Sequence, residues 1–198
     1  MSIQYQLAPG CCLTQAVYPL PVDFDGIWGL GKDQARPIRS IYGKKVRVPR
    51  TSRNYGSAYH HSGESHAGGE CPDVLLPLKV WANRYAERMG EQPFDNIVLN
   101  LYDNGRDYIS RHKDDEPQIR PGSCILSVSF GETRTFRLRN NNGAIVLDVP
   151  MNDGCVLVMH GPMFQSTLTH EVPKVSGAKG AALGRRINVT FRQFVKTP

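Results

Sequence analysis

Apolar and polar residues alternate with a period of two over most of residues 94–194, and this pattern constrains the fold more than any other feature. Successive side chains of a β-strand point to opposite faces, so the alternation is typical of strands with one buried face. Turn-forming glycine and asparagine residues, as in 140–143 and 152–154, separate the runs. The candidate strands cover residues 96–102, 108–113, 124–130, 134–139, 144–149, 154–160, 167–172 and 186–194. Seven or eight short strands at this spacing predict a β-sandwich or jelly roll.

The residues before this region predict extended structure and one or two helices. Pro77 can occupy the first turn of a helix, and Gly90 can end it. Between them an apolar stripe recurs every three or four residues, formed by Leu78, Trp81, Ala82, Tyr85 and Met89. A short amphipathic element is expected near residues 23–30, extended chain over 38–62 and a loop over 62–72. We therefore predict a mainly β (α+β) protein whose jelly roll is braced by one or two N-terminal helices.

Composition limits the class of protein. The 198 residues can form one well-buried core and are few for two ordinary domains. With 40% hydrophobic and 21% charged residues, a soluble globular protein is expected, and no apolar run approaches the roughly 20 residues that cross a bilayer. The first residues lack the pattern of a secretory signal, and the five cysteines lack zinc-type spacing. We expect an intracellular monomer, in cytoplasm or nucleus, with no membrane partner.

The formal net charge of +6 is concentrated in one segment. Between residues 36 and 53 the chain has seven cationic residues and no acidic one: Arg36, Arg39, Lys44, Lys45, Arg47, Arg50 and Arg53. A solvated basic strand would explain the run. A patch that contacts the phosphates of a nucleic acid is the alternative, and it would make the partner a polyanion.

A histidine and a carboxylate lie two residues apart in His112-Lys113-Asp114, so on a strand both point to one face. Together they are two-thirds of the 2-His-1-carboxylate triad that holds non-haem Fe(II). Alone, such a triplet is weak evidence, because it is frequent by chance. The third ligand would be His160 or His170, and either could instead be a structural histidine.

The last predicted strand carries two arginines and an amide on one face. Polar residues Arg186, Asn188, Thr190 and Arg192 alternate there with Ile187, Val189 and Phe191. Asn100 and Tyr102 likewise share a face on the strand before His112. Such groups suit a small dicarboxylate, because arginine binds a carboxylate through two parallel hydrogen bonds. An outer strand with a wet polar face fits the alternation equally well.

Four blocks, in order along the chain, resemble the AlkB family of Fe(II)/2-oxoglutarate-dependent dioxygenases. They are Asn100-x-Tyr102-x-x-Gly105, His112-x-Asp114-x-Glu116, the distal His170, and Arg186-x-Asn188-x-Thr190-Phe191-Arg192. The blocks lie within residues 96–194, about half of the chain. The resemblance implies a double-stranded β-helix, which is a jelly roll and agrees with the strand pattern.

The same resemblance implies a set of cofactors and a chemistry. His112, Asp114 and His170 would bind Fe(II). The carboxylates of 2-oxoglutarate would be held by two arginines and three further residues: Arg186, Arg192, Asn100, Tyr102 and Asn188. The implied reaction consumes O2, decarboxylates 2-oxoglutarate to succinate and hydroxylates an N-methyl carbon, after which formaldehyde leaves an unmodified base. The protein supplies the open coordination site, the orientation and the exclusion of water.

The N-terminal half is similar to the branch of that family that repairs duplex DNA. The similar segments are Ile41-Tyr42-Gly43-Lys44, Pro49-Arg50, Tyr55-Gly56 and Tyr59-His60-His61-Ser62-Gly63. An enzyme that acts on a base takes it out of the stack and holds it between aromatic faces. The resemblance implies that Tyr42 fills the vacated stack, that Tyr59 and His61 line the base pocket, and that Arg50 and its basic neighbours contact phosphate.

Two positions depart from that branch, and an acidic pair agrees with it. Tyr42 and His61 stand where Phe is usual; both keep a flat face, but a histidine stacks less apolar area and titrates. Asp115 and Glu116 follow the implied iron ligands as in that branch, where the acidic pair lies beside the target base. A solvated turn is the alternative for this pair.

We therefore expect an oxidative demethylase that repairs N-alkylated bases of the 1-methyladenine and 3-methylcytosine type in DNA. The alternatives are the same oxygenase chemistry on RNA or on a protein side chain, and a non-catalytic nucleic-acid-binding jelly roll. The chain is expected to form one domain over residues 1–198. Residues 1–70 would form an N-terminal extension and nucleotide-recognition lid, and 71–198 a helix plus the jelly-roll catalytic core.

Overall fold

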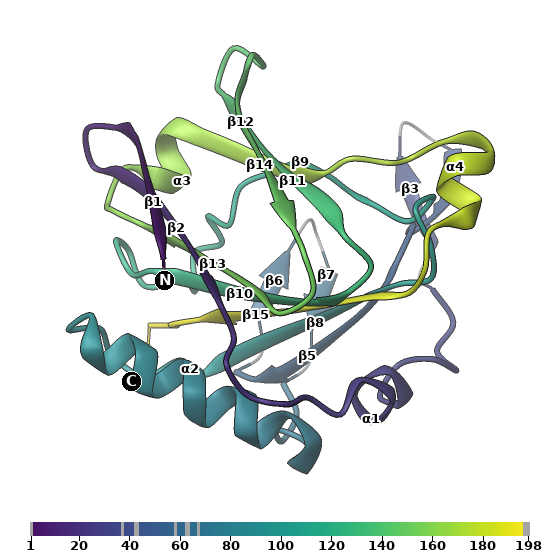
Figure 1. Cartoon of the computed structure of the whole chain (residues 1–198), viewed down its shortest axis with the longest axis horizontal. Helices are drawn as coiled ribbons and strands as arrows, with labels where there is room; N and C mark the ends of the chain where they lie inside the picture. The colour runs from purple at the N-terminus through teal and green to yellow at the C-terminus, as the bar shows by residue number, and fades with distance from the viewer. Residues whose placement is uncertain are drawn as a thin grey trace.

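Two antiparallel sheets pack face to face in the computed structural model, which describes residues 2–36, 38–41, 44–57, 59–61, 64–66 and 68–195 (Figure 1). For residues 39–41, 44, 59–61 and 64–66 the description concerns the backbone alone. The larger sheet has the strand order β1 (Ile3–Ala8), β2 (Cys11–Val17), β13 (Cys155–His160), β10 (Ile125–Gly131), β15 (Arg186–Arg192), β8 (Asn96–Tyr102) and β5 (Thr51–Gly56). The smaller sheet has the order β12 (Ile145–Met151), β11 (Arg134–Asn140), β14 (Leu168–Val172) and β9 (Ile109–His112). This arrangement confirms the predicted jelly roll.

The helices are short apart from α2 (Leu76–Arg88), which lies along the outer face of the larger sheet (Figure 1). Its predicted stripe is confirmed in part: Leu78 and Ala82 are buried in the cluster between helix and sheet, and Trp81 and Tyr85 pack partly buried against it, whereas Met89 is exposed. Burying one large apolar side chain of this kind is worth roughly 1.5–3 kcal/mol. The other helices are α1 (Phe24–Gly29), a 3-10 turn η1 (Asp73–Leu75), α3 (Phe164–Thr167) and α4 (Gly177–Ala182). No helix in the described part of the chain is both long and apolar enough to span a membrane.

Strand β15 divides its side chains between two environments, as its alternation predicts. Ile187, Val189 and Phe191 are fully buried in the cluster beneath α1 and α2. The polar residues of the strand point the other way, into the space between the two sheets, and all of them are also buried. The alternative of an outer strand with a wet face is therefore wrong.

The N-terminal region contributes more to the sheets than its sequence indicates. Strands β1 and β2 were not predicted, yet β2 pairs along its whole length with β13. Two hairpins complete the described strands: β3 (Ile38–Ile41) with β4 (Lys44–Arg47), and β6 (Tyr59–His61) with β7 (Glu64–His66). The loop expected over 62–72 thus contains β7. The division at residue 70 remains a prediction about function, although β1, β2 and β5 all belong to the larger sheet.

Candidate metal and co-substrate site

His112, Asp114 and His170 come together at one end of the space between the sheets. Strands β9 and β14 pair so that His112 and His170 lie directly opposite each other, with ring centroids 4.2 Å apart. Asp114 lies two residues beyond β9, and its Oδ2 is 3.5 Å from His170 Nε2. The candidate ligand atoms of the three side chains all lie within 4.8 Å of one another. Across the described residues, this is the one cluster of such side chains that could hold a metal ion.

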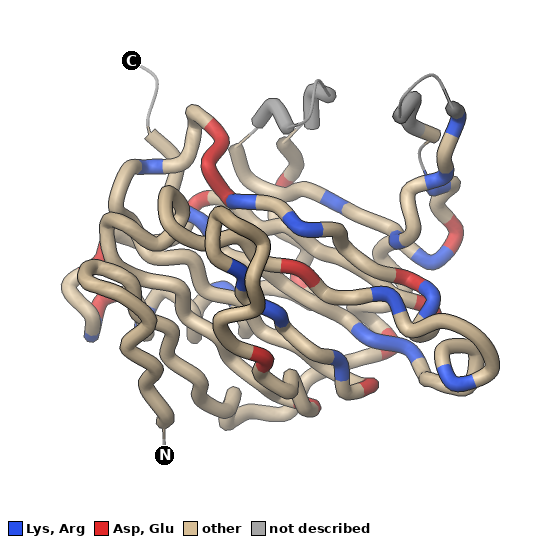
Figure 2. The backbone as a smooth tube through the Cα atoms, turned by 90° about the horizontal axis from the view of Figure 1, so that it is seen from above, with Lys and Arg blue, Asp and Glu red and all other residues tan. Residues whose placement is uncertain are grey.

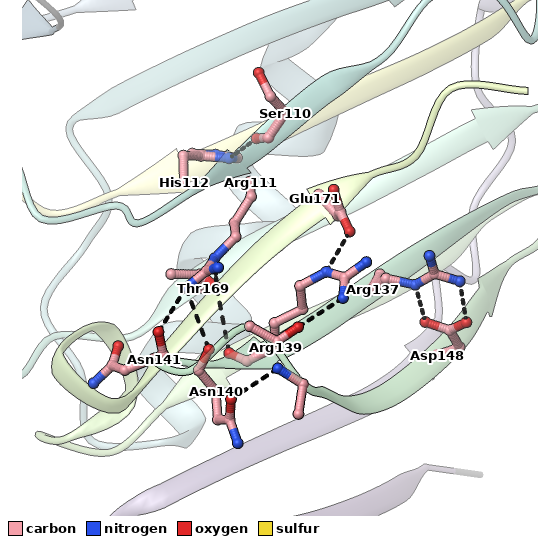
Figure 3. Close-up of polar contacts among 12 residues, drawn as sticks. Ser110, Arg111, His112, Arg137, Arg139, Asn140, Asn141, Asp148, Thr169 and Glu171 are labelled. Atoms are coloured by element: carbon pink, nitrogen blue, oxygen red, sulfur yellow. Dashed lines mark hydrogen bonds and ion pairs between the residues drawn. The ribbon is translucent and has the colours of Figure 1, made fainter.

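The electrostatics of the cluster favour the protonation states that a metal requires. Burial, with help from His170, lowers the pKa of His112 to about 3, so its imidazole is neutral near neutral pH. His112 Nδ1 lies 2.8 Å from the carbonyl oxygen of Ser110 and donates to it, which leaves the lone pair on Nε2 (Figure 3). Burial alone would raise the pKa of Asp114, but Arg192 and the two histidines together hold it below its usual range. Asp114 is therefore a carboxylate.

Arg186 carries a guanidinium group into the protein interior with only part of its hydrogen bonding satisfied. The side chain is 1% exposed, and its Cζ lies 4.8 Å from the centroid of the Tyr102 ring. Nη2 donates to Ser129 Oγ at 2.8 Å and to Asn188 Oδ1 at 3.0 Å. Nε and Nη1 are buried and have no hydrogen-bond partner among the described residues. A buried cation in this condition is costly, and an anion at this place would satisfy it, so the residues fit a carboxylate of 2-oxoglutarate.

A cavity between the sheets reaches from the three candidate ligands to two residues that contact Arg186. It is lined by Asn100, Tyr102, Ile109, His112, Asp114, Ser127, Phe136, Met151, Leu157, Met159, His170, Val172, Asn188, Thr190 and Arg192. Tyr102 and Asn188, which contact Arg186, are thus in the same cavity as the ligand cluster. A ligand with one end at the metal and the other at Arg186 would lie entirely within the jelly roll.

Arg192 lies closer to the carboxylates of the iron-ligand segment than the sequence predicts. Its Nη2 makes a short hydrogen bond to Asp114 Oδ1, and its Nη1 is 3.6 Å from Glu116 Oε1. The expectation that both arginines grip 2-oxoglutarate stays a prediction. What this geometry adds is a bridge from a candidate iron ligand to one residue of the acidic pair.

His160, which the sequence offered as an alternative third ligand, does not belong to the cluster of His112, Asp114 and His170. It lies on β13 opposite Cys12, and its Nε2 is 3.0 Å from Thr14 Oγ1. Burial lowers its pKa. His160 is therefore a half-buried residue in the ladder between β13 and β2, and His170 occupies the place next to His112.

The acid-free basic segment is only partly exposed to solvent. Arg36 donates to Asp103 and Asp107, Arg53 Nε donates to the carbonyl oxygen of Leu30 at 3.2 Å, and Arg50 Nε donates to Asn100 Oδ1 at 2.9 Å. Within residues 36–53, the cationic side chains that are described and exposed are those of Lys45 and Arg47. Arg50 was expected at a phosphate, and the structure places it against a residue that lines the co-substrate cavity.

Arginines recur along the strands of the smaller sheet (Figure 2), and the side chains of Arg111, Arg137 and Arg139 are hydrogen-bonded to neighbours there (Figure 3). Arg137 makes a two-pronged contact with Asp148, with distances of 2.8 and 2.7 Å. Arg139 Nε donates to Glu171 Oε1 at 2.7 Å, and Arg111 Nε donates to Thr169 Oγ1 at 2.8 Å. These cations stabilise the sheet locally, so the net positive charge is not simply a free patch on this face.

Among the residues expected to recognise a base, the structure describes the side chains of Asp115 and Glu116 but not those of Tyr42, Tyr59 and His61. Tyr42 lies outside the described residues, and for Tyr59 and His61 only the backbone of β6 is given. Asp115 and Glu116 line a cavity of about 290 Å³ that also contains Asp114 and Gln165. Asp115 is exposed, as a solvated turn would be, but Glu116 is 7% exposed and lies near Arg192.

Sequence reasoning missed several residues of the site. Ser127 and Ser129 both donate to Asn188 Oδ1, at 2.9 and 3.1 Å, and so hold the amide beside Arg186. Their alternation with Leu126, Val128 and Phe130 along β10 was a signal that could have placed them on the inner face. Gln165 and Met151 gave no such signal.

Comparison with known proteins agrees with this geometry. The sequence of residues 31–192 matches the family model of the 2OG-Fe(II) oxygenase superfamily. Human DNA oxidative demethylase ALKBH2 is 32% identical over 168 residues, covering 79% of this chain and 61% of that protein. Human alpha-ketoglutarate-dependent dioxygenase alkB homolog 3 is 34% identical over 130 residues, covering 61% of this chain and 43% of that protein. The chain thus spans about three-fifths or less of the length of these two human relatives.

One solved structure shows the likeness of fold. The solved structure of OsALKBH1 superimposes with a TM-score of 0.56, and the match covers 96% of this chain and 100% of that chain at 17% sequence identity. At this identity the comparison concerns the fold alone.

Proposed function

The chain belongs to the 2OG-Fe(II) oxygenase superfamily and, within it, to the AlkB family, and from this premise we propose that it is an oxidative demethylase of N-alkylated DNA bases. Lesions of the 1-methyladenine and 3-methylcytosine type are the proposed substrates. The observation that carries the proposal is the cavity whose lining includes the two histidines, the carboxylate of Asp114, and Tyr102 and Asn188, which contact the buried Arg186. The names of the relatives supply the class of substrate.

We assign the proposed roles to the following polar side chains in and beside the cavity. His112, Asp114 and His170 would hold Fe(II), which together with 2-oxoglutarate and O2 supplies the oxidation of the N-methyl carbon. Arg186, assisted by Tyr102, Asn188, Asn100 and Arg192, would bind and orient 2-oxoglutarate. The neutral imidazole of His112 and the ionised carboxylate of Asp114 need no proton loss before they bind a cation. The buried, sheet-enclosed position of the cavity excludes bulk water from the reaction.

The base would enter beside the acidic pair. Methylation at these ring positions gives a cationic base, and Asp115 and Glu116 place negative charge at the cavity next to Asp114. Tyr59 and His61 are proposed to stack on the extracted base, Tyr42 to fill the space it leaves in the duplex, and Arg50 to bind at the approach to the site. The exposed Lys45 and Arg47 would contact phosphate. DNA against RNA, an intracellular location and a monomeric state remain predictions.

A turnover assay with methylated oligonucleotides tests the proposal. With Fe(II) and 2-oxoglutarate, the protein should release succinate and formaldehyde in proportion to the bases repaired. His112→Ala and Asp114→Ala should reduce this turnover at least about 100-fold, because removing a ligand removes the metal. His160→Ala is the matched control, since His160 lies outside the cluster, and it should stay near wild type.

Four results would contradict or redirect the proposal. If 1-methyladenine and 3-methylcytosine stay untouched in single- and double-stranded DNA, the repair function is wrong. Equal turnover of an RNA oligonucleotide would favour RNA as the substrate, and turnover without nucleic acid would favour a protein side chain. Nucleic-acid binding by a folded sample that binds no iron would indicate a non-catalytic jelly roll.

A further inference from the structure

The strand that leads into two of the candidate iron ligands is held by few backbone contacts. β9 is the edge strand of the smaller sheet and, among the described strands, pairs only with β14, through His112 opposite His170 and Ile109 opposite Val172, with an irregularity between them. Asp114 lies beyond the last pair. If the register continued for two more residues, Asp114 would face Leu168. Leu168, however, is the first residue of β14, directly after the end of α3. The ladder therefore ends before it reaches Asp114.

A buried backbone N–H that has left a ladder needs another acceptor. Asp114 is 3% exposed, and its N–H donates to Gln165 Oε1 at 3.0 Å. Next to it, Lys113 Nζ donates to the carbonyl oxygen of Ser166 at 3.0 Å. Two consecutive residues of the ligand segment are thus tied to two consecutive residues of α3, the turn that leads into the strand of His170.

The turn that carries Gln165 is itself fixed by the hairpin of β1 and β2. The N–H of Met163 donates to the carbonyl oxygen of Gly10, at 3.2 Å. Gly161 has φ +103, and a Cβ built on it would lie 2.2 Å from that same oxygen, so only glycine allows the approach. Phe164 is 2% exposed and anchors the turn in the core between the sheets. This hairpin precedes residue 31, where the family match begins.

We propose that Gln165 is a positioning residue for the iron site: its side-chain oxygen completes the ladder at Asp114 and so fixes the direction of the Asp114 carboxylate. The inference rests on the proposed function of the same site. The carboxylate must meet the metal within a few tenths of an ångström, and groups that hold a ligand in this way affect metal affinity nearly as strongly as ligands do. Through Gly10, the N-terminal hairpin supports the same geometry.

Metal binding to the metal-free protein gives a readout that does not depend on turnover. Co(II) is the probe, because its visible absorption bands report both affinity and ligand geometry. Gln165→Met keeps the size of the side chain and removes the acceptor, and Gln165→Glu keeps an acceptor oxygen. Gln15→Met is the matched control: Gln15 is also half-buried and accepts a hydrogen bond, from Tyr5 at 3.0 Å, but it lines neither of the two cavities that Asp114 lines.

The expected result is a selective loss of metal affinity. Gln165→Met should raise the dissociation constant for Co(II) about 10- to 100-fold and alter the absorption bands. Gln165→Glu should stay closer to wild type than to Gln165→Met, and Gln15→Met should bind as wild type does. Thermal unfolding of the metal-free proteins should differ little between the two Met variants, which separates positioning from a general loss of fold.

Other outcomes would overturn the inference. Wild-type affinity and spectrum in a folded Gln165→Met protein would show that the acceptor is not needed; should that variant fail to fold, Gln165→Ala decides by the same criterion. Equal losses in Gln165→Met and Gln15→Met would mean a general effect of packing. If the wild-type protein binds no Co(II), the proposed function fails as well, whereas an unchanged Gln165→Met leaves that function standing.

Discussion

Arg186 carries a buried positive charge whose Nε and Nη1 have no hydrogen-bond partner in the part of the chain that the structure describes. The ring of Tyr102 packs against the guanidinium group, and Ser129 and Asn188 accept hydrogen bonds from Nη2. Burial lowers the pKa of Arg186, although a guanidinium keeps its proton at any ordinary pH. The side chain therefore serves a ligand more than it serves the fold.

Arg186→Met should separate these two roles. The affinity for 2-oxoglutarate should fall about 10- to 100-fold, because a charge-assisted hydrogen bond contributes roughly 1.5–3 kcal/mol. The free energy of unfolding without 2-oxoglutarate should stay the same or rise, because an apolar side chain replaces an incompletely paired buried charge. Calorimetric titration with 2-oxoglutarate and urea unfolding measure the two quantities.

Arg134→Met is the control for this prediction. Arg134 is 4% exposed, but its nitrogens donate to the carbonyl oxygens of Asn104, Asp107 and Pro173. Its replacement should lower stability by about 2–4 kcal/mol through the carbonyl groups left unpaired, with little change in 2-oxoglutarate affinity. The Arg186 prediction is wrong if the two variants behave alike.

At the same scale, sequence reasoning found side chains whose roles follow from local spacing. His112 and Asp114 are two residues apart, and the polar face of β15 follows from alternation within one strand. Gln165 and Asp114 are far apart in the chain, and their contact depends on where β14 leaves α3. The same holds for Arg192, whose bridge to Asp114 depends on how the two sheets are stacked. No local pattern contains that information.

Among the elements, the hairpin of β3 and β4 begins shortly after an ion pair between a half-buried arginine and a buried carboxylate. Arg36 Nη1 and Nη2 both lie 2.6 Å from the carboxylate oxygens of Asp107, which also accepts the N–H of Asp103. Asp107 is 6% exposed and lies between β8 and β9. The hydrogen bond to Asp107 raises the pKa of Arg36. This pair fixes the base of the hairpin to the segment that leads to the iron ligands.

Arg36→Met should therefore affect both stability and the choice of substrate. Leaving the Asp107 carboxylate buried without its cation should lower the free energy of unfolding by roughly 2–3 kcal/mol. A variant whose hairpin has a loose base should lose more activity on duplex than on single-stranded oligonucleotides. Tyr42 follows β3 in the sequence and is proposed to fill the vacated base stack, and only a duplex has a stack to be filled. Urea unfolding and paired turnover assays measure the two effects.

Arg137→Met provides the comparison, since Arg137 makes the same two-pronged contact with Asp148 on the outer face (Figure 3). Its cost should stay within about 1 kcal/mol, because solvent screens an exposed pair. A preference for duplex that is unchanged in Arg36→Met would contradict the role given to the base of the hairpin.

Elements were predictable where their own residues carry the pattern. The eight strands from β8 to β15 and helix α2 lie within two residues of their predicted bounds, because each has either an apolar period or a continuous apolar run between turn residues. Strand β2 (Cys-Cys-Leu-Thr-Gln-Ala-Val) has no alternation, since its first three residues are all buried. Its extended form is set by pairing with β1 and β13, and such tertiary pairing overrides a weak local preference.

For the molecule as a whole, the candidate ligands make stability dependent on pH. The pKa of His112 is lowered to about 3 in the folded protein, so the unfolded chain binds the proton first as the pH falls below about 6.5. Stability is therefore full above that pH and declines toward about pH 3. The lowered pKa of Asp114 acts in the same direction at still lower pH, below about 4.

Metal-free protein should lose up to about 2 kcal/mol of unfolding free energy between about pH 6.5 and pH 5 from His112 alone, because a tenfold difference in proton affinity between the folded and unfolded chains corresponds to about 1.4 kcal/mol. Urea unfolding at several pH values in the presence of a chelator measures this. His112→Gln should flatten the dependence without removing it, because burial also lowers the pKa of His160. An identical pH dependence in His112→Gln would contradict the assignment.

The hairpin of β1 and β2 has a further consequence for solubility. In a chain that lacked it, β13 would be the edge of the larger sheet, with the hydrogen-bonding groups of Cys155-Val-Leu-Val-Met-His exposed along it. An apolar strand in that position invites a second copy to add itself edge to edge, the first step of aggregation. The present edge is β1, whose glutamines and half-exposed residues make a poorer template. The same fifteen residues, 3–17, that brace the turn of Gln165 thus also protect the sheet from joining its own copies.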